Sequence, residues 1–147
     1  MNNTNTSRNK APWHLWAVGL LAILWYLNGL YDFASTTTRQ ADYTAQFSEA
    51  MHRFYDAMPI WAIAAWGAAE VFGIVGGVLL LFKNQFSFHA FGCGLLAILV
   101  NFVYNFILAD ASTAIGSSAV YFEAIVVIST SLFLAYSYWM SATDVLS

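Results

Sequence analysis

The stretch of sequence that decides the fold is IWAIAAWGAAEVFGIVGGVLLLF, residues 60–82, which directly follows Pro59. Glu70 is its one charged residue, and the rest is apolar or small. An α-helix rises about 1.5 Å per residue, so about 20 apolar residues cross the hydrocarbon core of a bilayer. The stretch is long enough, and a proline at the first turn of a helix loses no hydrogen bond. It therefore predicts a transmembrane helix.

Three further runs have the same character, at residues 13–33, 88–108 and 120–140. The chain as a whole is 60% hydrophobic and 9% charged, whereas soluble domains carry about 25% charged residues. We expect an all-α fold, a four-helix transmembrane bundle that forms a single domain over residues 12–147. Residues 1–11 are polar and are expected to be a disordered cytoplasmic tail.

The connections between the runs constrain the packing. Residues 83–87 form so short a link that the second and third helices must be an antiparallel hairpin. The long first loop, residues 34–58, places Phe47, Met51, Phe54 and Met58 at helical spacing. That spacing predicts a short amphipathic helix that lies on the membrane surface or caps the bundle. The last loop, residues 109–119, is small and polar and is expected to be flexible.

The distribution of basic residues predicts the orientation. Arg8, Lys10 and Lys83 would lie on one side of the membrane, and Arg39 and Arg53 on the other. Lysine and arginine near helix ends favour the cytoplasmic side, so both termini are expected there. The bilayer is then the expected partner, and the net charge of -3 with no basic cluster gives no indication of a nucleic-acid partner.

The polar residues inside the runs are the candidate functional residues, because ionisable groups are costly in lipid. Glu70 lies near the middle of its run. Several other polar residues lie in the outer half of the predicted bundle, and their helical spacing places them on shared helix faces. We hypothesise an outward-facing polar cavity that binds a ligand or protons. Its floor would be Glu70, and its walls would be Asn28, Asp32, Asn101, Asn105 and Glu123.

A structural role is the alternative for each of these residues. Asparagines and a neutral glutamate can hydrogen-bond one helix to another, with about 0.6 kcal/mol gained per bond on average. Asp32 and Glu123 are close to the predicted ends of their runs, where solvation at the interface is the simpler explanation. All five lysines and arginines lie outside the four runs, so Glu70 has no basic partner within them.

Small residues recur every fourth position in the second run, at Ala65, Ala69, Gly73 and Gly77. Such a ladder lets helices approach closely, which would turn Glu70 towards the protein interior. The same ladder is also compatible with packing against a second copy of the chain.

No motif identifies a reaction. His14 and His89 are weak candidates for a metal or haem, since both lie at the predicted inner ends of helices and neither has a second ligand one turn away. We therefore predict no metal and no cofactor, and do not expect an enzyme. Cys93 is the single cysteine, which excludes an internal disulfide, and it is expected to be buried and inert.

Three segments carry a resemblance: PWHLW (residues 12–16), NGLYDF (28–33) and MPIWAIAAW (58–66). They resemble a largely uncharacterised family of small four-helix bacterial inner-membrane proteins, some labelled "sugar transporter". More distantly, four helices with a glutamate and glycines in the second are similar to the DoxX-like group, some members of which are linked to quinone-coupled redox chemistry. The resemblance implies a bacterial inner membrane and carries over no functional residue.

Two classes of function remain. The first, which asks less of the sequence, is an accessory or structural membrane subunit or homo-oligomer whose polar residues serve helix association. The second is the handling of a small solute, a proton or a quinone in the cavity floored by Glu70.

Overall fold

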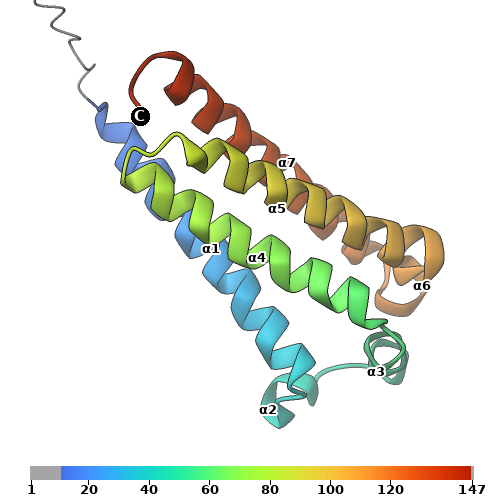
Figure 1. The fold of residues 1–147 in the computed structure, drawn as a ribbon. Helices are drawn as coiled ribbons and strands as arrows, with labels where there is room; N and C mark the ends of the chain where they lie inside the picture. The colour runs from blue at the N-terminus through green and yellow to red at the C-terminus, as the bar shows by residue number, and fades with distance from the viewer. Residues whose placement is uncertain (1–10, 147) are drawn as a thin grey trace, which may run out of the picture.

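The computed structural model describes residues 11–146, so nearly all of the predicted tail lies outside the described residues. Four long helices dominate it: α1 (Trp13–Thr37), α4 (Ile60–Leu81), α5 (Phe86–Phe102) with its continuation η1 (Val103–Leu108), and α7 (Ser117–Ala142). Each of the four is long and apolar enough to cross a membrane. The predicted all-α four-helix bundle is confirmed (Figure 1), and the protein is a multi-pass membrane protein.

The four helices pack in the order α1, α4, α5, α7. A tight turn joins α4 to α5 as the predicted antiparallel hairpin, and Lys83 in that turn has a positive φ of 57°. The buried Ser87 hydroxyl donates to the Gly76 carbonyl at 3.0 Å, which ties the two helices together. Gly76 also leaves room for the ring of Phe91, since a Cβ there would lie 2.8 Å from that ring.

Glycines allow the equally close packing of α4 on α1. A Cβ at Gly77 would lie 2.8 Å from the Ile23 side chain, and one at Gly73 would overlap the ring of Tyr26. Ala69 of the same ladder is buried, whereas Ala65 is half-buried. The ladder thus faces a neighbouring helix of its own chain over Gly73 and Gly77.

Short helices close one end of the bundle, which we call the capped end: α2 (Ala41–Thr44), α3 (Glu49–Asp56) and α6 (Ala111–Ile115). Ser48 caps α3 by accepting from the Met51 amide at 3.2 Å. The apolar face of α3 buries Phe54 with Met58 and Ala111. Of the two predicted positions for the amphipathic helix, the structure therefore has the one that caps the bundle.

The structure differs from two further expectations. Residues 109–119 are not a flexible loop but include α6, because Ala111 is 1% exposed and packs in the α3 cluster. Cys93 is exposed on the outer face of α5 rather than buried, because the glycines on either side of it, and not the thiol, face the neighbouring helices.

The last turn of the third span is π-helical. The amide of Ala109 donates to the carbonyl of Tyr104, five residues earlier, at 2.9 Å. Single π-helical turns are rare and occur often at functional sites. This one begins at Val103, two residues after Asn101, and contains Asn105.

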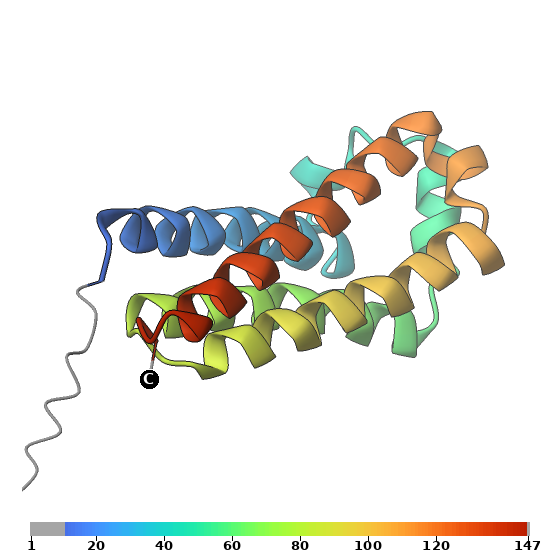
Figure 2. The same ribbon diagram turned by 90° about the horizontal axis from the view of Figure 1, so that it is seen from above.

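At the opposite, terminal end, Leu15, Leu80, Met140 and Leu146 form a small core. There His14 of α1 reaches α7 by a 2.5 Å hydrogen bond between Nδ1 and the Tyr136 hydroxyl. Towards the capped end α1 and α7 diverge (Figures 1 and 2), and they do not pack along each other. The bundle is therefore closed at the terminal end and open along one flank, between α1 and α7.

Candidate functional site

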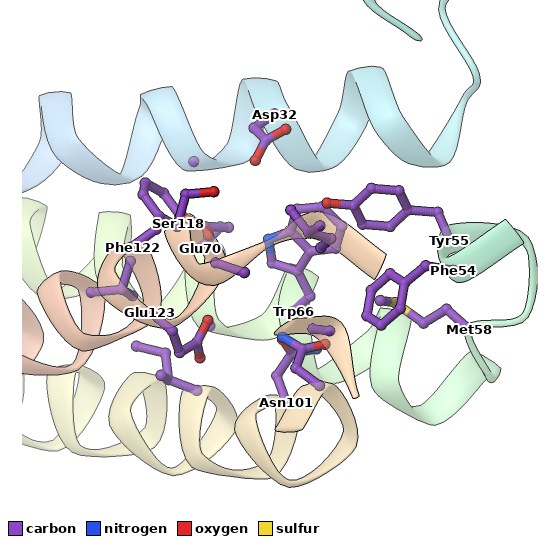
Figure 3. A pocket seen from close by; sticks show the side chains of 18 of the residues that line it. Asp32, Phe54, Tyr55, Met58, Trp66, Glu70, Asn101, Ser118, Phe122 and Glu123 are labelled. Carbon is purple, nitrogen blue, oxygen red and sulfur yellow. The ribbon is translucent and has the colours of Figure 1, made fainter. Parts of the chain in front are cut away.

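A cavity of about 420 Å³ lies in the capped half of the bundle. Side chains of all four long helices line it, and α3 and α6 close it at the capped end. Figure 3 shows Phe54, Tyr55 and Met58 on that side, with carboxylates of three helices facing the same space. A volume of this size is typical of small-molecule sites, which span about 300–1,000 Å³.

The floor of the cavity is a buried hydrogen bond between α1 and α7. The hydroxyls of Tyr26 and Thr130 lie 2.7 Å apart, and both side chains are nearly inaccessible. The Tyr26 ring packs against Phe91 and Phe133, with ring centroids 6.4 Å and 6.1 Å away. This layer separates the cavity from the core at the terminal end.

Asp32, Glu70 and Glu123 reach the cavity from α1, α4 and α7. Asp32 accepts from the Tyr43 hydroxyl at 2.5 Å and from Thr36 at 3.3 Å. Glu70 accepts a hydrogen bond from the indole of Trp66, one turn earlier on α4, and feels the charges of the two other carboxylates. Its carboxylate is seated against Gly29 of α1, where a Cβ would overlap it.

Glu123 differs from the other two. It is half-buried and lies in the second turn of α7. No hydrogen bond from another described residue reaches its carboxylate. Among the described residues that line the cavity there is no lysine, arginine or histidine. The three carboxylates therefore face one space without a basic partner.

Two asparagines form a hydrogen-bonded pair on the α5 side. The buried Asn101 amide donates to the Ala62 carbonyl of α4 at 3.0 Å. Asn105 in the π-helical turn donates to Asn101 Oδ1 at 2.8 Å. Asn105 Oδ1 is buried and accepts no hydrogen bond within the described residues. Of the candidate polar residues, Asn101 is the one that bonds a neighbouring long helix.

Tyrosines from the cap complete the acidic side of the cavity. Burial, and then the hydrogen bond to Asp32, raise the pKa of Tyr43 above its ordinary value. Burial, and then the negative charge of Asp32, raise the pKa of Tyr55 to about 12. Both phenols are therefore neutral at physiological pH, and Tyr43 serves as a hydrogen-bond donor that holds the Asp32 carboxylate in place.

The open flank gives the cavity a rim. Asn28 of α1 and Ser118 of α7 line the cavity and are exposed, and Phe122 beside them is 55% exposed. These residues lie where α1 and α7 diverge, with Ser118 in the first turn of α7. The cavity is therefore bordered on this side by exposed side chains of the two helices, as well as by the cap.

The histidines lie away from this site. His14 bonds Tyr136 and stacks on Trp139 with ring centroids 6.2 Å apart, whereas His89 packs against Phe86 and Phe88. No group of three or more metal-ligating side chains occurs in the part of the chain that the structure describes.

Sequence reasoning missed the aromatic part of the site. Trp25, Tyr26, Tyr43, Tyr55 and Trp66 line the cavity, and aromatic residues in apolar helices or in a loop do not stand out from packing or interfacial residues. The phase of Trp66, four positions before Glu70, was the one available signal. Comparison of the chain with known protein families, curated proteins and solved structures found no match.

Proposed function

We propose that this protein binds a small amphiphilic solute, which enters the cavity from the bilayer between α1 and α7. The observation that carries the proposal is the position of a cavity of about 420 Å³ on the flank where two long helices diverge. Apolar walls with a few polar groups are the usual make-up of a small-molecule site. A solute with an apolar body reaches such a flank by partitioning into lipid.

The hydrogen bonds favour this function over helix association alone. A polar residue that holds helices together must bond across an interface. Asp32 bonds α2 and its own helix, Glu70 bonds its own helix, and Glu123 bonds no described residue. Association therefore accounts for Asn101, and for Asp32 as the residue that holds α2 to α1, but leaves Glu70 and Glu123 without a hydrogen bond to another described helix.

An accessory subunit or homo-oligomer is the second candidate, because of α7. This helix packs on α5 and leaves large side chains such as Ile128 and Leu132 exposed, at 60% and 65%. A partner helix on that face would cover the open flank as well. Cross-linking of a cysteine placed at Ile128 tests for it in a chain with Cys93 replaced by serine.

For the cellular setting we propose the bacterial inner membrane, with both termini in the cytoplasm. Even numbers of spans bring both termini to one side, and Lys83 lies at that end, over the Trp16 ring at 5.6 Å. Arg39 and Asp56 form a 2.7 Å ion pair at the other end, which lowers the weight of Arg39 as a cytoplasmic signal.

The test is saturable binding of a neutral apolar fluorophore, N-phenyl-1-naphthylamine, to the protein in lipid nanodiscs. Trp25 and Trp66 line the cavity, so bound probe is excited by energy transfer from tryptophan. Ala119→Phe fills the cavity from α7, whereas Ala124→Phe adds the same ring on an exposed face of the same helix. We expect the saturable signal in the wild type and in Ala124→Phe, and its loss in Ala119→Phe. Identical signals from all three proteins would contradict the proposal.

A further inference from the structure

The described side chains that line the cavity include three acidic groups and no basic one. Three carboxylates face it, from α1, α4 and α7, and each ionised carboxylate is an acceptor only. Four of the donors nearby have partners in the wall: the Tyr43 hydroxyl bonds Asp32, the Trp66 indole bonds Glu70, and the Asn101 and Asn105 amides each bond an amide oxygen. The wall therefore offers negative charge and acceptors to whatever enters.

We infer that the ligand of the proposed cavity is an organic cation on an apolar body, held by Glu123 and Glu70. The inference rests on the proposed function and names its ligand class. Glu123 has no hydrogen-bond partner among the described residues, so a positive group is its natural complement. Glu70, which is held against Gly29 and feels the charge of Glu123, supplies the second negative group.

The aromatic rings of the cavity select for a bulky cation of low hydration. Trp25, Tyr26, Tyr55, Trp66 and Phe122 line the space around the carboxylates. The faces of aromatic rings attract cations within about 6 Å, and quaternary or substituted ammonium groups are recognised in this way. Trp66 is fixed for this role by edge contact with Phe33, at 5.3 Å between centroids, and by stacking on Tyr55 at 6.1 Å.

Other ligand classes fit the cavity less well. An anion meets three carboxylates and no described base. A quinone has only acceptor oxygens, which ionised carboxylates cannot bond. A small inorganic cation needs several oxygen ligands arranged around it at short distance. The described residues contain no group of three or more metal-ligating side chains. An organic cation combines the charge that the carboxylates attract with the apolar surface that the rings and the lipid-facing entrance accept.

Two probes of the same shape test the inference. Benzyltrimethylammonium and its neutral carbon isostere, neopentylbenzene, each compete with N-phenyl-1-naphthylamine in nanodiscs. We expect the cation to compete better, by on the order of tenfold, because charge is the difference between them. Glu123→Gln should remove that preference, since it deletes a charge without deleting a hydrogen bond within the described protein. Helix content by circular dichroism verifies that the variant is folded.

Glu49→Gln is the matched control, because Glu49 lies at the same end of the bundle, is 93% exposed in its side chain and is outside the cavity. It should retain the preference for the cation. Equal competition by the two probes, or competition by neither while the fluorophore signal still depends on Ala119, would overturn the cation assignment and leave the proposed cavity standing. Loss of the preference for the cation in the Glu49→Gln control as well as in Glu123→Gln would likewise overturn the cation assignment. Failure of the fluorophore signal to depend on Ala119 is the separate result that removes the proposed function.

Discussion

Substitution of Gly73 by alanine tests the packing that forms the cavity floor. A Cβ at Gly73 would overlap the Tyr26 ring. That ring is 2% exposed and is held by Phe91, Phe133 and the 2.7 Å bond to Thr130, so it has no free space to enter. We expect α1 and α4 to be forced apart and the bond to Thr130 to be lost.

The magnitude follows from three contributions. Overpacking of a close-packed site costs about 1–3 kcal/mol, and loss of an interhelical hydrogen bond in a membrane costs about 0.6 kcal/mol. Alanine gains about 1 kcal/mol over glycine in helix propensity. Gly73→Ala should therefore lower the free energy of unfolding by about 1–3 kcal/mol, as the sum of these contributions.

Gly92→Ala is the matched control on α5, because a Cβ there meets only Leu134 Cδ1 at an ordinary 3.9 Å. The helix-propensity gain is common to both variants and cancels when they are compared, which leaves a difference of about 2–4 kcal/mol. Unfolding by sodium dodecyl sulphate in mixed micelles, followed by tryptophan fluorescence and circular dichroism, measures it. Equal stability of Gly73→Ala and Gly92→Ala would refute the close contact between Gly73 and Tyr26.

Three further predictions concern single contacts. Burial and Asp32 raise the pKa of Tyr55 from 10.0 to about 12. Neutral Tyr55 therefore stabilises the fold fully below pH 10.0 and progressively less up to about pH 12. A pH titration of unfolding should show this loss of stability in the wild type and a smaller loss in Tyr55→Phe. Ser87→Ala removes the buried bond to the Gly76 carbonyl and should cost about 0.6–1.5 kcal/mol in the same unfolding assay, whereas an unchanged stability would show that the bond contributes nothing. Asp110, at φ 46°, accepts 2.6 Å hydrogen bonds from two hydroxyls of α6. Asp110→Ala should speed hydrogen exchange in α6 more than Asp110→Asn, because asparagine tolerates this backbone conformation. Equal exchange rates in the two variants would contradict that explanation.

The polar candidate residues show how much of the site could be predicted from the sequence. The helical phase of Glu70, Asn101 and Asn105 was readable, because residues four apart share a face, and the structure places all three in one cavity wall. The partners of these residues were not readable. Tyr43 lies in the long loop and bonds Asp32 only because α2 folds back beside α1, and sequence spacing contains no information about that return.

The sequence by itself determined the number of long helices, their approximate bounds and the α4–α5 hairpin, because apolar length and loop length are local properties of the chain. It also determined that no lysine or arginine lies within the four apolar runs. The tertiary structure alone decided that α1 and α7 diverge, that residues 109–119 close the cap with α6, and that Glu123 faces the cavity without a hydrogen-bond partner in the described part of the chain. These features depend on which helices touch, and that choice is made by the fit of glycines such as Gly73 and Gly76 to the rings of Tyr26 and Phe91, a complementarity between segments distant in sequence.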